Sequence, residues 1–281
     1  MMNWELEKIS EEEIQKEISV ILERKSLLND KQQLQLILNC IDLTTLEGKD
    51  NDRKAIELCK QARSFSENGP DIPNVAAVCF YPPFAEVAKS QLLETGIKVA
   101  CVAGAFPSGQ SPLDLRVKEV EYAVSKGADE IDMVISRGKF LEGDYNFVYN
   151  EVKAIKEACG DAHLKVILET GELQTAANIK LASEIAIAAG ADFIKTSTGK
   201  MSPAATIEAF YVMLNVIKEH FNKTGKMIGI KPAGGISDVD VAKQYILVLE
   251  NVLGEKWMSN QWFRIGASRL ANRVLEALLS K

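Results

Sequence analysis

The chain has 281 residues, of which 47% are hydrophobic and 26% are charged, a composition typical of a folded globular protein. Acidic residues outnumber basic residues by 39 to 33, and the formal net charge of -6 excludes the broadly basic surface of a general nucleic-acid-binding protein. The five cysteines are widely spaced and include no Cys-x-x-Cys pair, so we expect neither a disulfide framework nor a zinc site.

Residues 4–27 alternate charged side chains with Leu and Ile at the spacing of an amphipathic helix. We interpret this helix as a cap under the main fold or a subunit contact, and divide the chain into an N-terminal helical extension, 1–30, and one domain, 31–281. The acidic N-terminus lacks the apolar stretch of a signal peptide, and no run approaches the ~20 apolar residues of a membrane helix. We therefore expect a cytoplasmic protein that binds neither membrane nor nucleic acid.

Short runs rich in Val and Ile then alternate with longer helical segments. The predicted strands are 34–44 (in its later part), 74–82, 97–104, 129–136, 164–170, 192–198, 227–234 and 262–268. The predicted helices that follow them are 52–66, 83–95, 113–126, 145–159, 174–189, 203–221, 237–252 and 268–279. Eight such units favour a (β/α)8 TIM barrel. An open, doubly wound sheet is the alternative, but the turn after the first strand, DLTTLEGKD, lacks the expected Gly-x-Gly-x-x-Gly.

Ionisable side chains stand inside several of these apolar strands, toward the ends where a barrel carries its chemistry. They are Asp42, Asp132, Glu169, Lys195 and Lys231, with Cys79 on the second strand. Satisfied ion pairs in a polar layer of the barrel are one explanation. Two lysines on neighbouring strands favour another, because burial and a nearby positive charge both lower the pKa of an amine. A neutral lysine attacks carbonyl groups, so the pattern indicates Schiff-base chemistry assisted by a carboxylate.

Glycines follow the last two predicted strands. Gly234 and Gly235 come after Lys231, and Gly266 and Ser268 lie where the eighth strand leads into a helix. Phosphate sites of such barrels form in these two loops, where glycine lets backbone N–H groups approach an anion. A tight turn is the simpler explanation, but the position of the glycines favours a phosphate site.

The two histidines, His163 and His220, precede the fifth strand and end a helix. Neither position favours catalysis, so we interpret both as structural and expect no metal and no cofactor.

Six motifs now point to a family: DLTTL, GADEIDMV, LKVILETGEL, DFIKTSTGK, IKPAGG and RIGAS, in this order between about Asp42 and Ala277. Together they resemble deoxyribose-phosphate aldolase, a class I aldolase. The resemblance implies a (β/α)8 barrel that reversibly cleaves 2-deoxy-D-ribose 5-phosphate into D-glyceraldehyde 3-phosphate and acetaldehyde without a metal.

The resemblance also implies roles for individual residues. Lys195 is similar to the Schiff-base lysine of the family, Lys231 to the companion that lowers its pKa, and Asp132 to the carboxylate of the proton relay. The residues that match other active-site positions are Asp42, Cys79, Thr198 and Lys200. Those that match the phosphate pocket are Gly234, Gly235, Gly266 and Ser268.

The chain departs from the family pattern in three places. Arg269 stands where well-known bacterial members have a second serine, and the final residues, EALLSK, lack the terminal tyrosine that assists proton transfer in some members. The N-terminal helix of about 25 residues is longer than in the shortest bacterial members, and Arg269 either adds charge to the phosphate site or points to solvent. Another Schiff-base enzyme such as a transaldolase, or a barrel that only senses a phosphorylated sugar, remains an alternative. The expected partners are a small phosphorylated sugar, aldehydes and a second copy of the chain in a homodimer.

Overall fold

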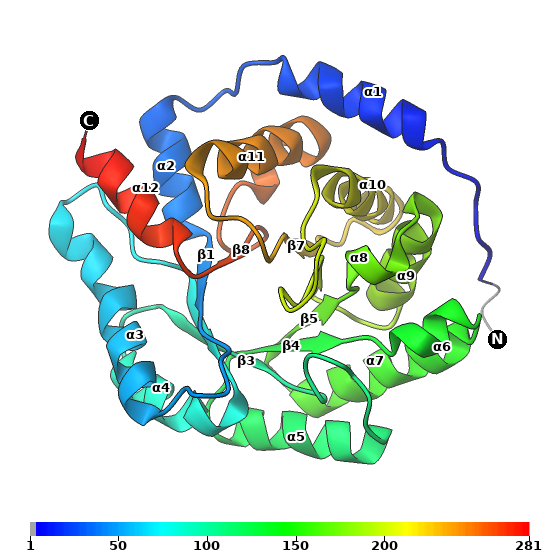
Figure 1. Ribbon diagram of the computed structural model, residues 1–281, viewed down its shortest axis with the longest axis horizontal. Coiled ribbons are helices and arrows are strands. Elements are labelled where there is room, and N and C mark those ends of the chain that lie inside the picture. The colour runs from blue at the N-terminus through cyan, green and yellow to red at the C-terminus, as the bar shows by residue number, and fades with distance from the viewer. Residues whose placement is uncertain (1–3, 281) are drawn as a thin grey trace.

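The computed structural model describes residues 4–280 and contains one sheet of eight parallel strands in the order β7-β6-β5-β4-β3-β2-β1-β8. Two further parallel bridges, Ile230 to Phe263 and Ala233 to Gly266, connect the β7 and β8 segments and so close the sheet into a barrel. Helices surround it on the outside (Figure 1). The predicted (β/α)8 barrel is therefore confirmed.

The strands are short and the main helices lie between them. The strands are β1 (Ile41–Thr44), β2 (Ala77–Phe80), β3 (Lys98–Val102), β4 (Glu130–Val134), β5 (His163–Ile167), β6 (Phe193–Lys195), β7 (Gly229–Lys231) and β8 (Ile265–Ala267). The helices are α1 (Glu11–Leu22), α2 (Asp30–Asn39), α3 (Asp52–Ser64), α4 (Ala85–Gln91), α5 (Leu113–Ser125), α6 (Arg137–Leu141), α7 (Tyr145–Cys159), α8 (Thr170–Leu173), α9 (Ala176–Ala188), α10 (Ile207–Thr224), α11 (Val239–Leu253) and α12 (Leu270–Leu279).

The alternation of side chains along each strand separates an outer apolar layer from the barrel interior. In β4, Ile131 and Met133 join the core between strands and helices, so Glu130 and Asp132 point inward. In β6, Ile194 belongs to the outer core, so Lys195 points inward. The same two-residue period therefore buries the outer face with aliphatic side chains and brings charged ones into the interior.

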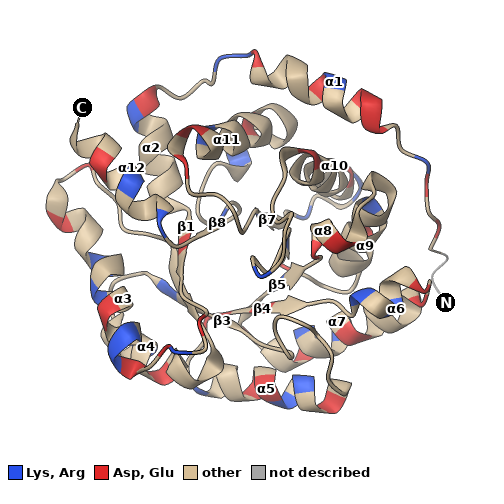
Figure 2. Ribbon diagram, viewed as in Figure 1, with Lys and Arg blue, Asp and Glu red and all other residues tan. Residues whose placement is uncertain are grey.

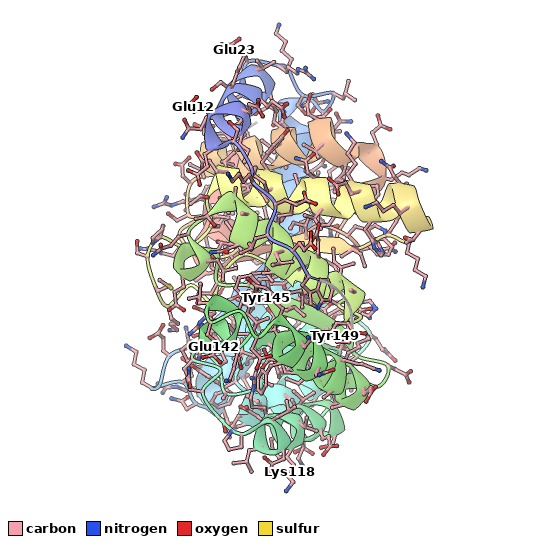
Figure 3. All side chains as sticks on the ribbon, turned by 90° about the vertical axis from the view of Figure 1, so that its right-hand side faces the viewer. Glu12, Glu23, Lys118, Glu142, Tyr145 and Tyr149 are labelled. Carbon is pink, nitrogen blue, oxygen red and sulfur yellow. The ribbon has the colours of Figure 1, made fainter. Side chains whose placement is uncertain are left out.

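The N-terminal helix is shorter than predicted and does not lie under the barrel. It spans Glu11–Leu22, begins where the Ser10 side chain accepts a hydrogen bond from the Glu13 N–H, and packs against α10 and α11. Its three buried isoleucines join the main core: Ile14, Ile18 and Ile21. Figures 1 and 3 show it on the outer side of the helical ring rather than under the barrel, which corrects the interpretation as a bottom cap.

The helix α2 is not among the helices predicted from the sequence. It begins with a capping box, in which the Asn29 side chain and the Gln32 side chain each bind the backbone N–H of the other residue. Only Cys40 separates its last residue, Asn39, from Ile41, the first residue of β1. The apolar residues of helix and strand thus follow one another with few polar interruptions in the sequence.

Charges of both signs are interspersed along the outer helices, for example on α3 and α5 (Figure 2). Among residues 4–280, no helix combines the length and the apolar character needed to cross a bilayer.

Candidate active site

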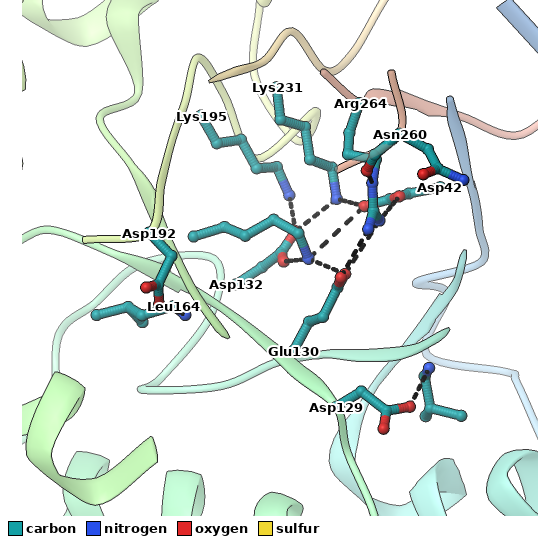
Figure 4. A network of polar contacts seen from close by, with 12 residues as sticks. Asp42, Asp129, Glu130, Asp132, Leu164, Asp192, Lys195, Lys231, Asn260 and Arg264 are labelled. Atoms are coloured by element: carbon teal, nitrogen blue, oxygen red, sulfur yellow. Dashed lines mark hydrogen bonds and ion pairs between the residues drawn. The ribbon is translucent and has the colours of Figure 1, made fainter. Parts of the chain in front are cut away.

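The barrel interior contains a buried network of charged side chains (Figure 4). It comprises three carboxylates and four cationic side chains, none of them more than 5% exposed. Six of the eight strands, or the residue just before them, supply these groups. The carboxylates are Asp42, Glu130 and Asp132, and the cations are Lys165, Lys195, Lys231 and Arg264.

Asp132 is the centre of this network and accepts hydrogen bonds from all three lysines. Lys165 Nζ lies 2.9 Å from its Oδ1. Lys195 Nζ and Lys231 Nζ both lie 2.7 Å from its Oδ2. Three positive neighbours outweigh the cost of burial and hold the pKa of the Asp132 carboxyl well below its usual range.

The remaining contacts satisfy the other charged groups. Lys231 Nζ also donates to Asp42 Oδ2 at 2.5 Å, and Arg264 donates to Asp42 Oδ1 at 2.8 Å. Arg264 binds both oxygens of Glu130, at 2.8 and 3.1 Å, and Lys165 Nζ lies 2.5 Å from Glu130 Oε2. The two hydrogen bonds from Arg264 to Glu130 form a bidentate pair, which is the strong geometry for an arginine and a carboxylate.

The network contains four basic groups and three carboxylates, so full protonation of the basic groups leaves one more positive than negative charge in the interior. Lys195 is the lysine that pairs with one carboxylate, Asp132, whereas Lys231 pairs with two. Burial lowers the pKa of Lys195, and the charge of Lys231 lowers it further, although Asp132 opposes both. For Lys231, burial is outweighed by Asp132 and Asp42, which raise its pKa. Lys195 is thus the amine that loses its proton most readily.

A pocket of about 390 Å³ opens at the C-terminal ends of the strands, above this network. Lys195 is the only one of the seven network residues that lines it. The pocket is also lined by six residues that the sequence analysis selected: Thr198, Lys200, Gly234, Gly235, Gly266 and Ser268. The structure therefore brings the predicted phosphate loops to the same opening as the amine with the lowered pKa.

Two glycines allow close packing around the network, because a side chain at either position would clash with its neighbours. A Cβ at Gly266 would lie 2.7 Å from the Cβ of Ala233 and 3.3 Å from Cε of Lys231, so glycine leaves room for that lysine. Gly234 has φ +85°, and its Cβ would lie 2.9 Å from Cα of Gly199, which allows the β6 and β7 loops to touch. Gly235, at φ +81°, is exposed with open space where a Cβ would be.

Cys79 points into the barrel beside Ala100 and Val102. Burial raises the pKa of its thiol to about 11, with a further increase from the Asp132 charge, so it stays protonated at neutral pH. Cys79 contributes an uncharged wall near the network rather than a nucleophile.

Glu169 is buried and does not itself line the pocket, but it holds one of the loops that do. Its backbone is left-handed, with φ 57° and ψ 62°, and its carboxylate accepts hydrogen bonds from the N–H and the hydroxyl of Thr198, at 3.1 and 2.5 Å. Arg137 lies 3.7 Å from the same carboxylate. Glu169 thus fixes the loop that carries Thr198 and Lys200.

Comparison with known proteins decides the family. Residues 36–245 match the DeoC/LacD family aldolase model, which covers more than half of the chain. The chain belongs to this family of aldolases. It is 45% identical, over 269 residues, to a Caenorhabditis elegans protein described as a "Putative deoxyribose-phosphate aldolase", covering 95% of this chain and 88% of that protein. The predicted resemblance is confirmed.

Solved structures agree with this assignment. A Coccidioides immitis protein with the same description superposes with a TM-score of 0.74 at 28% identity, covering 96% of this chain and 98% of that one. An Aeropyrum pernix deoxyribose phosphate aldolase, described as having a unique tetrameric structure, matches with a TM-score of 0.71 at 24% identity over 97% and 99% of the two chains. The second match speaks for the fold alone.

Three members of the network in this aldolase are not among the site residues predicted from the sequence: Glu130, Lys165 and Arg264. Glu130 lies two residues before Asp132 and therefore shares its inward face, and Lys165 pairs in register with Asp132 on the next strand. The two-residue period, applied outward from Asp132, was the available signal for Glu130.

The two histidines lie at the opposite end of the barrel from the pocket, around an opening whose wall includes Glu130 and Arg264. Among the described residues, no group of three or more His, Cys, Asp or Glu side chains is arranged to hold a metal ion.

Proposed function

We propose that this aldolase reversibly cleaves 2-deoxy-D-ribose 5-phosphate into D-glyceraldehyde 3-phosphate and acetaldehyde through a Schiff base on Lys195. The observation that carries the proposal is the position of Lys195, the one network residue that lines the pocket and also a lysine whose pKa is lowered. A class I mechanism follows, because an uncharged amine replaces the metal as the means of activating the carbonyl group.

In the cleavage direction, the Lys195 amine adds to C1 of the open-chain sugar aldehyde, and loss of water gives an iminium ion. The C3 hydroxyl then loses its proton and the C2–C3 bond breaks, with its electron pair passing into the iminium. Glyceraldehyde 3-phosphate leaves, and an enamine remains on Lys195. Protonation of the enamine carbon and hydrolysis release acetaldehyde and regenerate the amine.

Asp132 and Lys231 supply the proton chemistry in this proposal. Asp132 contacts Lys195 directly and exchanges protons with the C3 hydroxyl and the enamine through water. Such general acid–base assistance typically contributes about 10²–10⁴ in rate. Lys231 holds its proton because of Asp42 and Asp132, and its charge keeps Lys195 neutral.

The phosphate group of the substrate would bind at the glycine loops. Gly234, Gly235 and Gly266 line the pocket with Ser268, and α12 begins two residues after Ser268, so its first N–H groups add a favourable dipole. Lys200 and Arg269 line the same pocket and bring positive charge.

The test is incubation of the purified protein with 2-deoxy-D-ribose 5-phosphate, with acetaldehyde and glyceraldehyde 3-phosphate measured separately. Equal amounts of both products support the proposal, and Lys195→Met should abolish them. A folded protein that releases neither product would contradict it. Borohydride trapping with other sugar phosphates would then test a transaldolase, and a sensor would gain no covalent mass.

We also propose a role in deoxyribose phosphate catabolism in the cytoplasm, with a homodimer as the assembly. Support comes from family membership. Light scattering of the purified protein measures the assembly directly.

A further inference from the structure

An ion pair crosses the mouth of the pocket. Glu47 follows β1, Lys200 follows β6, and Lys200 Nζ lies 3.0 Å from Glu47 Oε1. Both residues line the pocket. Because β8 and β7 separate β1 from β6 in the barrel, this contact spans the opening instead of joining neighbouring loops.

A carboxylate is unexpected in a pocket that would take a phosphate dianion, since like charges at short range repel. The other charged side chains that line the pocket are Lys195, Lys200 and Arg269, all basic. Glu47 is therefore the feature that opposes anion binding, and it pairs with one of the three basic residues that line the pocket.

The backbone on both sides of the ion pair is held in place. On the β1 side, Asp50 accepts hydrogen bonds from the Thr45 hydroxyl and from the Glu47 N–H, the latter at 2.9 Å. On the β6 side, the Lys200 N–H donates to Thr198 Oγ1 at 3.1 Å. The loops need not move for the pair to open.

Both side chains of the ion pair reach solvent. The Glu47 side chain is 60% exposed and the Lys200 side chain 33%, so each can leave the pair without disturbing the core. A rotation of Glu47 into solvent would release Lys200 to a phosphate group at the neighbouring glycine loops.

We propose that Glu47 is a specificity-determining residue, which occupies Lys200 in the empty pocket and is displaced by the phosphate of the substrate. The proposal rests on the proposed function. When a phosphorylated substrate binds, Lys200 exchanges the Glu47 carboxylate for the phosphate group. A substrate without phosphate leaves the ion pair between Lys200 and Glu47 in place. Exposed ion pairs are weak, so removing Glu47 should lower KM for the phosphorylated sugar about two- to fivefold.

The experiment compares Glu47→Gln with the unmodified protein on 2-deoxy-D-ribose 5-phosphate and on unphosphorylated 2-deoxyribose. The expected result is a lower KM for the first substrate and little change for the second. Glu57→Gln is the matched control, because Glu57 on α3 pairs with Arg53 at the surface and does not line the pocket. It should leave both substrates unaffected.

A Lys200→Met background separates competition from simple repulsion. If Glu47 acts by occupying Lys200, most of the gain from Glu47→Gln should disappear when Lys200 is absent. An equal gain in both backgrounds, or an unchanged KM in the single variant, would overturn the proposal.

Titration with inorganic phosphate gives the same comparison without turnover. The Glu47→Gln protein should bind phosphate more tightly than the unmodified protein by a similar factor, and equal affinities would overturn the proposal. A protein that shows this difference but cleaves no sugar would contradict the proposed function and leave the role of Glu47 standing.

Discussion

Lys195 and Lys231 donate hydrogen bonds to the same oxygen of Asp132, each at 2.7 Å. They are also paired in register on β6 and β7. Two ammonium groups this close lower each other's pKa. Asp42 is a second partner of Lys231 and helps to raise its pKa, so the lysine with the lowered pKa is the one that lines the pocket.

Covalent trapping should label Lys195. Borohydride added with acetaldehyde should reduce the Schiff base to a stable two-carbon adduct, because Lys195 combines access to the pocket with a lowered pKa. Peptide mapping by mass spectrometry locates the adduct, which should also block tryptic cleavage after Lys195.

Two other lysines serve as internal controls for this labelling. Lys231 and Lys165 are buried in the same network, but their pKa values are raised by the carboxylates that they contact. An adduct on either of these, with Lys195 unmodified, would refute the assignment.

Removal of Lys231 should move the acidic limb of the pH–rate profile to higher pH. Lys231→Leu leaves three cations against three carboxylates, so Lys195 retains its proton and a higher pH is needed to generate the amine. The pKa of Lys195 should move up toward the ordinary lysine value of 10.5. A shift of one pKa unit corresponds to about 1.4 kcal/mol. The rate of Schiff-base formation against pH measures it.

Lys231→Arg is the matched variant for this test, because it keeps the charge and changes the shape. Its acidic limb should stay near that of the unmodified protein even if its rate falls. If Lys231→Leu also left the limb in place, the charge of Lys231 would have no part in keeping Lys195 neutral.

Much of this arrangement could be predicted from the sequence. The β6 and β7 segments are apolar, so the lysines in them stood out, and Asp132 stood out in β4 for the same reason. Glu130 and Arg264 were harder to recognise, because each lies near the start of its segment, where a charge usually reaches solvent. Burial arises only when the strands close into a barrel and bring Arg264 within 2.8 Å of Glu130.

The N-terminal helices show a second limit of sequence patterns. The spacing of Ile14, Ile18 and Ile21 predicts an apolar face, and that face is buried. The same spacing does not say which part of the molecule covers it, and the structure places α10 and α11 there. The location of an amphipathic helix depends on the shape of the partner surface, which the pattern does not contain.

Loss of the Glu130 charge should destabilise the fold. Glu130→Gln removes a carboxylate from Arg264 and Lys165 and leaves buried cations with too few partners. Breaking a buried ion pair in this way typically costs about 3–5 kcal/mol. Urea unfolding measures the free energy of unfolding, and Glu57→Gln at the surface should cost less than about 1 kcal/mol.

The same variant should shift the pH–rate profile in the direction opposite to Lys231→Leu. With four cations and two carboxylates, the pKa of Lys195 falls further, so the acidic limb moves to lower pH. The two variants together test the balance of charges. If the acidic limbs of Glu130→Gln and Lys231→Leu moved in the same direction, the balance of charges would not control the pKa of Lys195.

The phosphate loop should be sensitive at Gly235. This residue has φ +81° and open space at its Cβ, and it lines the pocket, so the methyl group of Gly235→Ala would stand where the proposed phosphate approaches the backbone. We expect a higher KM for 2-deoxy-D-ribose 5-phosphate and little change for unphosphorylated 2-deoxyribose.

Gly254→Ala is the control, because Gly254 has φ +78° and equally open surroundings but does not line the pocket. It should lose stability through backbone strain, of order 1–3 kcal/mol, without the effect on KM. Equal damage to both substrates by Gly235→Ala would show that this loop shapes the barrel mouth rather than the phosphate site.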